Sequence, residues 1–360
     1  MHRHREFRFM AEVTSPHDQP IDKLWLSMDW DPARQWSFFE LVRAGELPPS
    51  THPPSSSIEP VWHPRERAPV VGGIKVVFET SDRARHARIV PVEYFRNAVQ
   101  RASVSLVQSK QLEVGQAFDY RVLAFAGPPS APASGACNDF DIDAIDDRLA
   151  LGSLSVETLL RRAERRCESA WNDRDLPVFM HARVLDEARS LAEAGNGVET
   201  GGMLIGRLCR DSDGGDLCLE VTAQVAARHT VATSSSLQFP PQSWADADAA
   251  ITLRNRGERL AGWHHCHPAE LWPCRNCPPE RRAKCPAAKA FFSGDDRALH
   301  RSVFPAAFNI ALLLSFLHEG APSIDLFGWR EGRIRPRGFY LLPRDDGGTP
   351  ARGGDDRSNP

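Results

Sequence analysis

The chain has 360 residues, a net charge of −3 at pH 7 and eight cysteines. Its length allows two domains of ordinary size, and the absence of a concentrated basic stripe argues against nucleic acid as the principal partner. The N-terminal residues lack the apolar core of a signal peptide, and the longest apolar run, from Phe304 to Leu317, is too short to span a bilayer. We therefore expect a cytoplasmic protein that contacts no membrane.

Residues 1–126 are expected to form a separate mixed α+β domain, whose role no motif identifies. Alternating apolar side chains predict strands at residues 6–10, 74–78 and 120–125. Residues 47–60 are rich in proline and serine, a composition that is typical of a loop.

Three further segments have distinct compositions. Residues 127–141 are rich in proline, serine and glycine, which predicts a linker. Residues 142–175 are charged and contain spaced leucines, which predicts a connecting helical segment. Residues 343–360 consist largely of Asp, Gly, Arg and Pro, which predicts a disordered tail.

Residues 176–342 are expected to form a second domain around a mixed sheet. Val184, Ala188 and Leu191 lie at positions i, i+4 and i+7, which predicts an amphipathic helix over residues 182–194. The other predicted elements are strands at 202–208, 217–227, 259–266, 308–316 and 324–329, and a helix at 242–256.

Two histidines separated by one residue end the strand predicted at 259–266. Residues i and i+2 of a strand point to the same face, so His265 and His267 can present two imidazoles to one metal ion. A carboxylate from elsewhere completes the ligands; we predict Asp296, with Asp295 as the rival, since adjacent residues in a turn entering a helix point apart. Three protein ligands and one open position are typical of catalytic zinc.

Two other polar residues are candidates for catalysis beside such a metal. Glu199 lies where a helix returns to a strand, and a carboxylate there can take a proton from the bound water and deliver it to the leaving amine. Ser293 could donate a hydrogen bond to the oxyanion of the tetrahedral intermediate. The alternative for Ser293 is a helix N-cap, and the two roles can coexist.

Together these residues resemble the JAMM (MPN+) family of zinc metalloproteases. The family pattern is a Glu ahead of a Gly-rich strand, then G-W-x-H-x-H-P, then S-x-x-D. It is met here by Glu199 ahead of residues 202–206, by residues 262–268, and by Ser293 with Asp296. The resemblance covers about residues 176–342, implies a cytidine-deaminase-like α/β fold, and favours Asp296 over Asp295 as the ligand. The arginine-rich composition suggests a bacterial member.

The resemblance also implies an activity. Such enzymes use one catalytic Zn²⁺ and a metal-activated water to cut after the C-terminal Gly of a ubiquitin-like modifier, in deconjugation or in precursor maturation. The expected partners are the ubiquitin-like protein substrate and its conjugating enzymes. Two alternatives stay open: a zinc hydrolase that processes a small sulfur-carrier protein, and a catalytically silent MPN binding scaffold.

The chain departs from the family pattern by a cysteine-rich insertion after the H-x-H-P motif. Cys274 and Cys277 form a C-x-x-C pair and Cys285 follows, which predicts a second, structural metal site. The candidates for a fourth ligand are Cys266, His264 and His300. Free thiols and an iron–sulfur cluster are the alternatives. On a strand, Cys266 should face away from the two metal-binding histidines.

Overall fold

The structure is a computed structural model. It describes residues 6–50, 53–66, 69–80, 82–127, 149–228, 231–232, 237–269, 278, 280, 291–316 and 322–344.

The chain separates into two compact units. Unit 1 comprises Met1–Leu151, Phe291–Ala311 and Phe327–Pro336. Unit 2 comprises Gly152–Ala290, Leu312–Leu326 and Arg337–Pro360. This division differs from the one expected from the sequence, because two segments of the C-terminal half group with the N-terminal residues.

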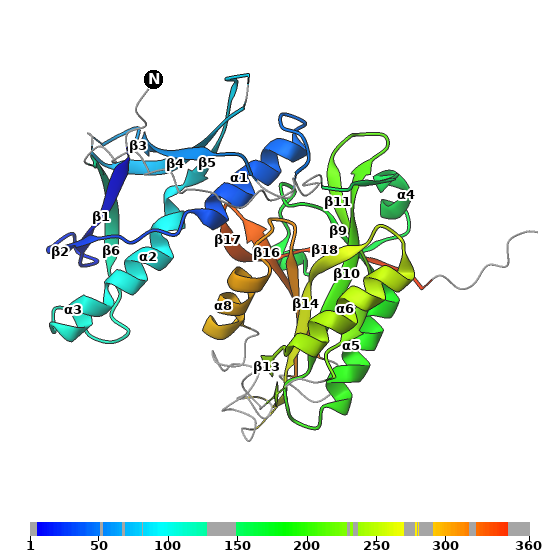
Figure 1. Ribbon diagram of the computed structural model, residues 1–360. Helices are drawn as coiled ribbons and strands as arrows, with labels where there is room; N and C mark the ends of the chain where they lie inside the picture. The colour runs from blue at the N-terminus through cyan, green and yellow to red at the C-terminus, as the bar shows by residue number, and fades with distance from the viewer. Residues whose placement is uncertain are drawn as a thin grey trace, which may run out of the picture. The chain divides into compact units, whose positions relative to one another are not determined.

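Two antiparallel sheets form in the described N-terminal part of unit 1 (Figure 1). The first has the order β2-β1-β6, from β1 (Phe7–Thr14), β2 (Pro20–Trp25) and β6 (Asp119–Ala126). The second has the order β3-β4-β5, from β3 (Ser56–Trp62), β4 (Val71–Glu79) and β5 (Arg85–Pro91). The three strands predicted in this region are confirmed as β1, β4 and β6.

The loop predicted at residues 47–60 is wrong at its C-terminal end, where β3 begins at Ser56. Composition misleads here because β3 is an edge strand, paired only with β4 in its sheet. Proline has no backbone N–H to donate. On an edge strand such as β3 this can be tolerated, because backbone groups on the side without a neighbouring strand take part in no ladder hydrogen bond.

Helices and aromatic side chains complete unit 1. Its helical elements are α1 (Asp31–Arg43), η1 (Val92–Phe95), α2 (Arg96–Ala102), α3 (Val104–Gln108) and α8 (Gly294–Val303). The Phe9 ring lies 5.3 Å from that of Trp30 and 5.1 Å from that of Phe95, measured between centroids. These contacts form part of the core, in which Phe95 is fully buried.

A mixed sheet runs through the second half of the chain, which confirms the mixed α/β class. The order is β17-β16-β15-β14-β10-β11-β9-β18-β8, and β7 also pairs with β10. Its strands are β7 (Gly152–Leu154), β8 (Glu164–Arg166), β9 (Val178–His181), β10 (Gly201–Asp211), β11 (Leu217–Ala226), β14 (Arg259–His267), β15 (Ile310–Ser315), β16 (Ser323–Arg330), β17 (Arg333–Arg337) and β18 (Phe339–Leu342). Parallel pairs join β9 to β11 and β18, and β7 to β10.

Helices α5 (Ala182–Ala194) and α6 (Pro241–Arg254) pack against the central strands of this sheet (Figure 1). The predicted helix at 182–194 is confirmed to the residue, because Val184, Leu185 and Ala188 form a buried stripe. The five strands and the second helix predicted in this domain are also confirmed, with ends shifted by at most three residues. Two short strands, β12 (Val231–Ala232) and β13 (Leu237–Gln238), pair with each other.

The connecting helix predicted at 142–175 is wrong. The described part, from residue 149, contains β7, a one-turn helix α4 (Val156–Leu160), β8 and a 3₁₀ turn η2 (Glu168–Ala170). Leu154 and Leu159 pack on the cluster that contains buried Cys209 and Cys218 of the sheet, and the extended stretches pair with β10 and β18. Sheet pairing therefore overrides the local helical preference.

Several predictions lie outside the described residues. These are the linker at 127–141 apart from residue 127, and the tail at 343–360 apart from Pro343 and Arg344. No helix in the described part of the chain is long and apolar enough to cross a membrane.

Candidate metal centre

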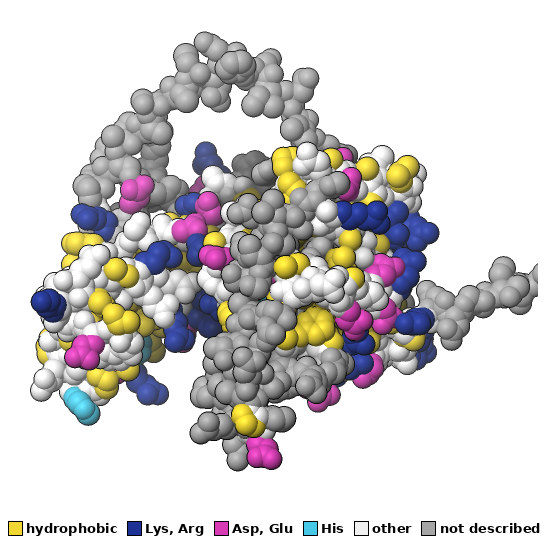
Figure 2. All heavy atoms as spheres, turned by 90° about the horizontal axis from the view of Figure 1, so that it is seen from below, with side chains coloured by type: hydrophobic (Ala, Val, Ile, Leu, Met, Phe, Trp, Pro, Cys, Tyr) yellow, Lys and Arg dark blue, Asp and Glu magenta, His cyan; other side chains and the backbone are white. Residues whose placement is uncertain are grey.

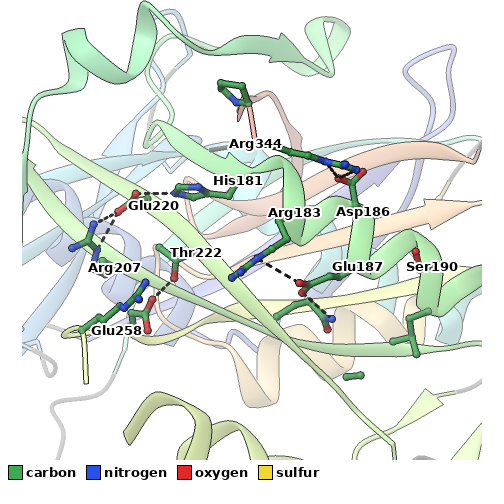
Figure 3. A pocket seen from close by; sticks show the side chains of 15 residues that line it. His181, Arg183, Asp186, Glu187, Ser190, Arg207, Glu220, Thr222, Glu258 and Arg344 are labelled. Carbon is green, nitrogen blue, oxygen red and sulfur yellow. Dashed lines mark hydrogen bonds and ion pairs between the residues drawn. The ribbon is translucent and has the colours of Figure 1, made fainter. Parts of the chain in front are cut away.

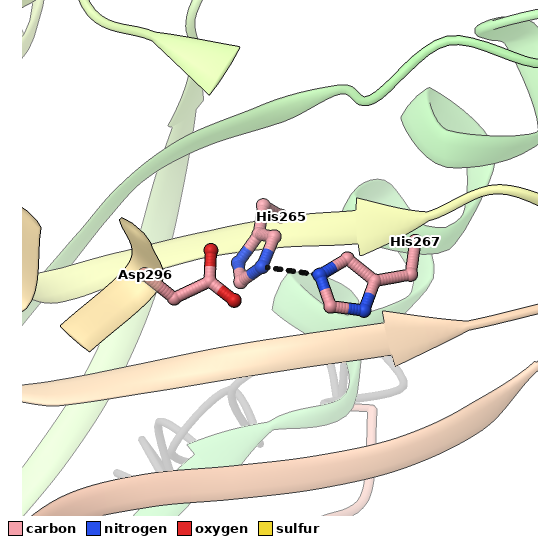
Figure 4. A group of neighbouring side chains, drawn as sticks. All are labelled: His265, His267 and Asp296. Carbon is pink, nitrogen blue, oxygen red and sulfur yellow. Dashed lines mark hydrogen bonds between the residues drawn. The ribbon is translucent and has the colours of Figure 1, made fainter. Parts of the chain in front are cut away.

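Strand β14 brings two imidazoles together at its C-terminal end (Figure 4). The Nε2 atoms of His265 and His267 lie 3.2 Å apart, and both rings are buried. Two nitrogens bound to one tetrahedral zinc at about 2.0–2.1 Å lie about 3.3–3.4 Å from each other. The two side chains therefore already have the separation that a shared ion requires.

Asp296 is the carboxylate that accompanies them. His265, His267 and Asp296 each offer a ligand atom, and these atoms all lie within 4.8 Å of one another. Figure 4 shows the carboxylate directed at the imidazoles. The neighbouring Asp295 is exposed and is not in the group, as predicted.

The N-terminus of α8 fixes this carboxylate. Ser293 is the N-cap: its Oγ accepts the amide hydrogen of Asp296 at 3.0 Å, and the Asp296 Oδ2 accepts the amide hydrogen of Ser293 at 2.7 Å. This capping box provides acceptors for two backbone N–H groups that have no partner within the first turn of the helix. The helix dipole also favours a negative charge there.

Stacking holds the first histidine. The rings of Trp263 and His265, two residues apart on one face of β14, are 4.4 Å apart and nearly parallel, at 12°. Trp263 is itself 1% exposed. Packing of this kind restricts the rotamer of the imidazole. A metal ligand needs such a restriction, because it must bind in one orientation.

Glu199 lies in the turn between α5 and β10, and its side chain is only 5% exposed. In the β10–β14 ladder Gly201 is opposite His265, and the Thr200 carbonyl accepts the amide hydrogen of Cys266 at 2.9 Å. Glu199 itself precedes β10, two residues before Gly201, so this contact holds the turn that carries it beside the end of β14.

The Cys266 side chain points away from the His265 and His267 imidazoles, as predicted, and it holds the turn between α5 and β10. Its Sγ accepts the amide hydrogen of Thr200 at 3.2 Å and lies 3.3 Å from the Thr200 hydroxyl. Burial raises the pKa of the thiol, so it stays protonated. Sequence analysis missed this role, because nothing in a sequence indicates that Cys266 meets a residue 66 positions earlier.

The other predicted ligands have different surroundings. His264 Nε2 bonds to Gln224 Oε1 at 3.1 Å, and burial, with a smaller effect from His265, lowers its pKa to about 3. His300 packs against Phe304 and Trp329, and burial lowers its pKa to about 3. Cys274, Cys277 and Cys285 lie outside the described residues, so the second metal site stays a prediction.

Gly202, the second residue of β10, has no room for a side chain. A Cβ on Gly202 would collide with the carbonyl oxygen of Val225 and lie 2.6 Å from His264 Nε2. Only glycine lets β11 and the His264 imidazole approach β10 so closely. The Gly-rich segment thus packs closely beside the strand that carries the two candidate histidine ligands.

A cavity of about 1180 Å³ lies in unit 2, away from the three metal-ligand candidates (Figure 3). None of the three metal-ligand candidates lines it, and most of its charged groups are paired: Glu220 with His181 and Arg207, Asp186 with Arg344, and Glu187 with Arg183. Gln224 links its wall to β14, since it also bonds to Glu187 at 3.4 Å. We place the chemistry at the group of His265, His267 and Asp296, because three side chains of a metal-binding type meet there.

On the face shown in Figure 2, both basic and acidic side chains of the described residues are present. That nucleic acid is not the principal partner stays a prediction.

Comparison with protein-family models finds no match, and neither does comparison with curated proteins. Among solved structures, the chain is similar to protein DSY2949 from Desulfitobacterium hafniense, with 19% identity, 46% of this chain and 92% of that chain covered, and a TM-score of 0.30. A likeness this weak carries no argument. The interpretation of the metal centre therefore depends on its own geometry and on the motifs.

Proposed function

We propose that this chain is a zinc-dependent peptidase or isopeptidase of the JAMM type, with a cytidine-deaminase-like domain over residues 176–342. The observation that carries the proposal is the 3.2 Å separation of the His265 and His267 Nε2 atoms, with the Asp296 carboxylate within 4.8 Å. Nitrogen, nitrogen and carboxylate oxygen form the donor set of many catalytic zinc sites, which leave one position open.

His265, His267 and Asp296 are the residues that would hold Zn²⁺. When bound, the ion supplies Lewis acidity, which makes a water nucleophilic at neutral pH and polarises a carbonyl group. Glu199 would act as the general base that takes a proton from the water and returns it to the leaving amine. It is buried, and the Thr200–Cys266 contact holds the turn that carries it beside the end of β14, which supports this role.

Ser293 is proposed to stabilise the oxyanion. Its Oγ already accepts the amide hydrogen of Asp296, so the hydroxyl proton is the group left to donate. A fixed donor of this kind is worth about 3–4 kcal/mol of transition-state stabilisation in comparable enzymes. Capping and catalysis are thus compatible in one side chain.

The proposed substrate is a ubiquitin-like protein cut after its C-terminal glycine, and its conjugating enzymes are proposed partners. The motif resemblance supports this choice. An extended tail can bind by main-chain hydrogen bonds at a sheet edge, and glycine allows its backbone to come close to a buried metal.

The test uses the purified full chain and ubiquitin-like fusions with a Gly-Gly junction, analysed by intact mass with and without chelator. We expect chelator-sensitive cleavage after the second glycine, no turnover with Glu199→Gln, and retained zinc in that variant. Cleavage of sulfur-carrier fusions alone would favour the sulfur-carrier alternative. A zinc-free, inactive protein would favour the silent scaffold.

A further inference from the structure

Five arginines converge on a second cavity, which lies wholly within unit 1. It has a volume of about 350 Å³, and its walls come from α2, α8 and the hairpin of β16 and β17. Every charged residue in its lining is an arginine: Arg96, Arg297, Arg301, Arg333 and Arg335. Such a concentration is unexpected in a chain of net charge −3.

Carboxylates neutralise only two of these arginines. Arg301 bonds to Asp29 at 2.5 Å and Arg333 bonds to Glu331 at 3.0 Å. Within the described residues, no ion pair is present for the other three, Arg96, Arg297 and Arg335.

Burial and like charges both act on Arg335. Burial lowers the pKa of its guanidinium, and the positive charges of Arg333, Arg96 and Arg330 lower it further. A cluster that repels itself destabilises the folded chain unless a negative charge joins it. The arrangement is therefore costly without a ligand.

Arg333 is a further unusual feature of this cavity wall. Its side chain is 12% exposed, and its Nε and Nη1 atoms are buried without a hydrogen-bond partner in the described chain. Buried donors are normally satisfied, so the Arg333 guanidinium keeps hydrogen-bonding capacity that the described chain does not use.

We propose that this cavity binds a compact polyphosphate anion, such as the phosphate chain of a nucleotide. Guanidinium groups pair with phosphate oxygens in a two-pronged geometry, and several phosphates in one small volume match five converging arginines. An extended acidic peptide would spread its charges along a groove, whereas this cavity is small and enclosed by three elements. The volume lies at the lower end of the range for small-molecule sites.

The site is independent of the proposed peptidase function, since none of its five arginines is a metal ligand. It does share an element with that function, because Arg297 and Arg301 lie on α8, the helix that begins with Ser293 and Asp296. A bound anion is therefore expected to stabilise α8.

The test is calorimetric titration of the full chain with sodium tripolyphosphate at physiological salt, together with a thermal melt. We expect saturable 1:1 binding and a melting temperature that rises with ligand concentration. The double variant Arg96→Gln/Arg335→Gln should weaken binding by more than about tenfold, since one hydrogen bond to a charged group is worth about that much.

The matched control is Arg65→Gln, which removes an exposed arginine outside the cavity and should leave binding unchanged. The double variant is expected to fold, because it relieves repulsion; its melting temperature without ligand checks this. Absence of binding, or equal binding by the double variant and the control, would overturn the proposal. Binding of a glutamate-rich peptide in preference to tripolyphosphate would overturn it too, in favour of a protein partner.

Discussion

Thr200 donates its amide hydrogen to the Sγ of Cys266 at 3.2 Å, and the Cys266 amide returns a hydrogen bond to the Thr200 carbonyl at 2.9 Å. Through this pair, the turn that carries Glu199 is fixed to the strand that carries both histidines. The proposed base and two proposed metal ligands are thereby held by one local contact.

Replacing Cys266 should separate positioning from metal binding. Cys266→Ala removes a buried acceptor and should cost about 1–3 kcal/mol of unfolding free energy, with lower kcat and an unchanged zinc content. Cys266→Ser restores an acceptor and should recover part of the kcat. Urea unfolding, zinc analysis and the Gly-Gly fusion assay measure the three quantities. If the alanine variant matched the wild type in kcat, Cys266 would have no positioning role.

The two adjacent aspartates provide a matched pair. Asp296→Asn removes a proposed ligand and should lower zinc affinity by more than about 100-fold, the upper range for loss of a residue that merely supports a ligand. Asp295→Asn changes the same charge on an exposed side chain and should leave affinity within a factor of about two of the wild type. Competition with a chromogenic chelator measures both affinities. Equal effects would mean that Asp296 acts only through its charge.

Ser293 is predicted to have two separable functions. Ser293→Ala removes the cap of α8, at a cost of about 1 kcal/mol, and also the proposed oxyanion donor. Ser293→Asp can still cap the helix but has no hydroxyl proton to donate, so it should recover stability without recovering kcat. Chemical denaturation and turnover of the fusion substrate report the two functions. Recovery of kcat by the aspartate variant would rule out the donor role.

Buried His300 predicts a loss of stability in acid. Burial lowers its pKa to about 3 in the folded protein, below the ordinary value of 6.5, so between these values the unfolded chain binds more protons than the folded one. Stability should therefore fall as the pH drops from 6.5 towards 3, by up to about 1.4 kcal/mol per pH unit for this group. In His300→Phe the slope of unfolding free energy against pH should decrease by the amount that corresponds to about one bound proton, whatever the absolute stability of the variant. An unaltered slope would indicate that His300 is not buried in its neutral form.

Gly202 is predicted to tolerate no side chain. Gly202→Ala should cost about 1–3 kcal/mol, the usual range for overpacking, because the new methyl meets the Val225 carbonyl and the His264 imidazole. The control is Gly294→Ala, where a Cβ meets nothing within 4 Å. Equilibrium unfolding of both variants gives the comparison, and equal stabilities would contradict the packing described for β10.

Local patterns were enough to predict many elements of unit 2. The helix over residues 182–194 follows from apolar spacing, and Gly195 ends it, because both signals lie within a few residues of the feature they specify. The two histidines were predicted from their spacing on a strand, and the motif resemblance favoured Asp296 over Asp295 as the carboxylate; ligand atoms of all three lie within 4.8 Å of one another.

What could not be predicted depends on residues far apart in the chain. The Thr200–Cys266 pair joins residues 66 positions apart, and the arginine cavity joins Arg96 to Arg297, about 200 positions later; no periodicity reports such contacts. The helix prediction for residues 152–166 was wrong for the same reason: β7 and β8 form strands because they pair with β10 and β18. In each case tertiary pairing, not local preference, decides the outcome.

An anomalous difference map, recorded at the zinc absorption edge on crystals of the full chain, tests the central claim most directly. We predict a peak about 2.0–2.2 Å from His265 Nε2, His267 Nε2 and one carboxylate oxygen of Asp296. A second peak in the cysteine-rich insertion would be compatible with this result. Stoichiometric zinc with no peak among these three side chains would contradict the account.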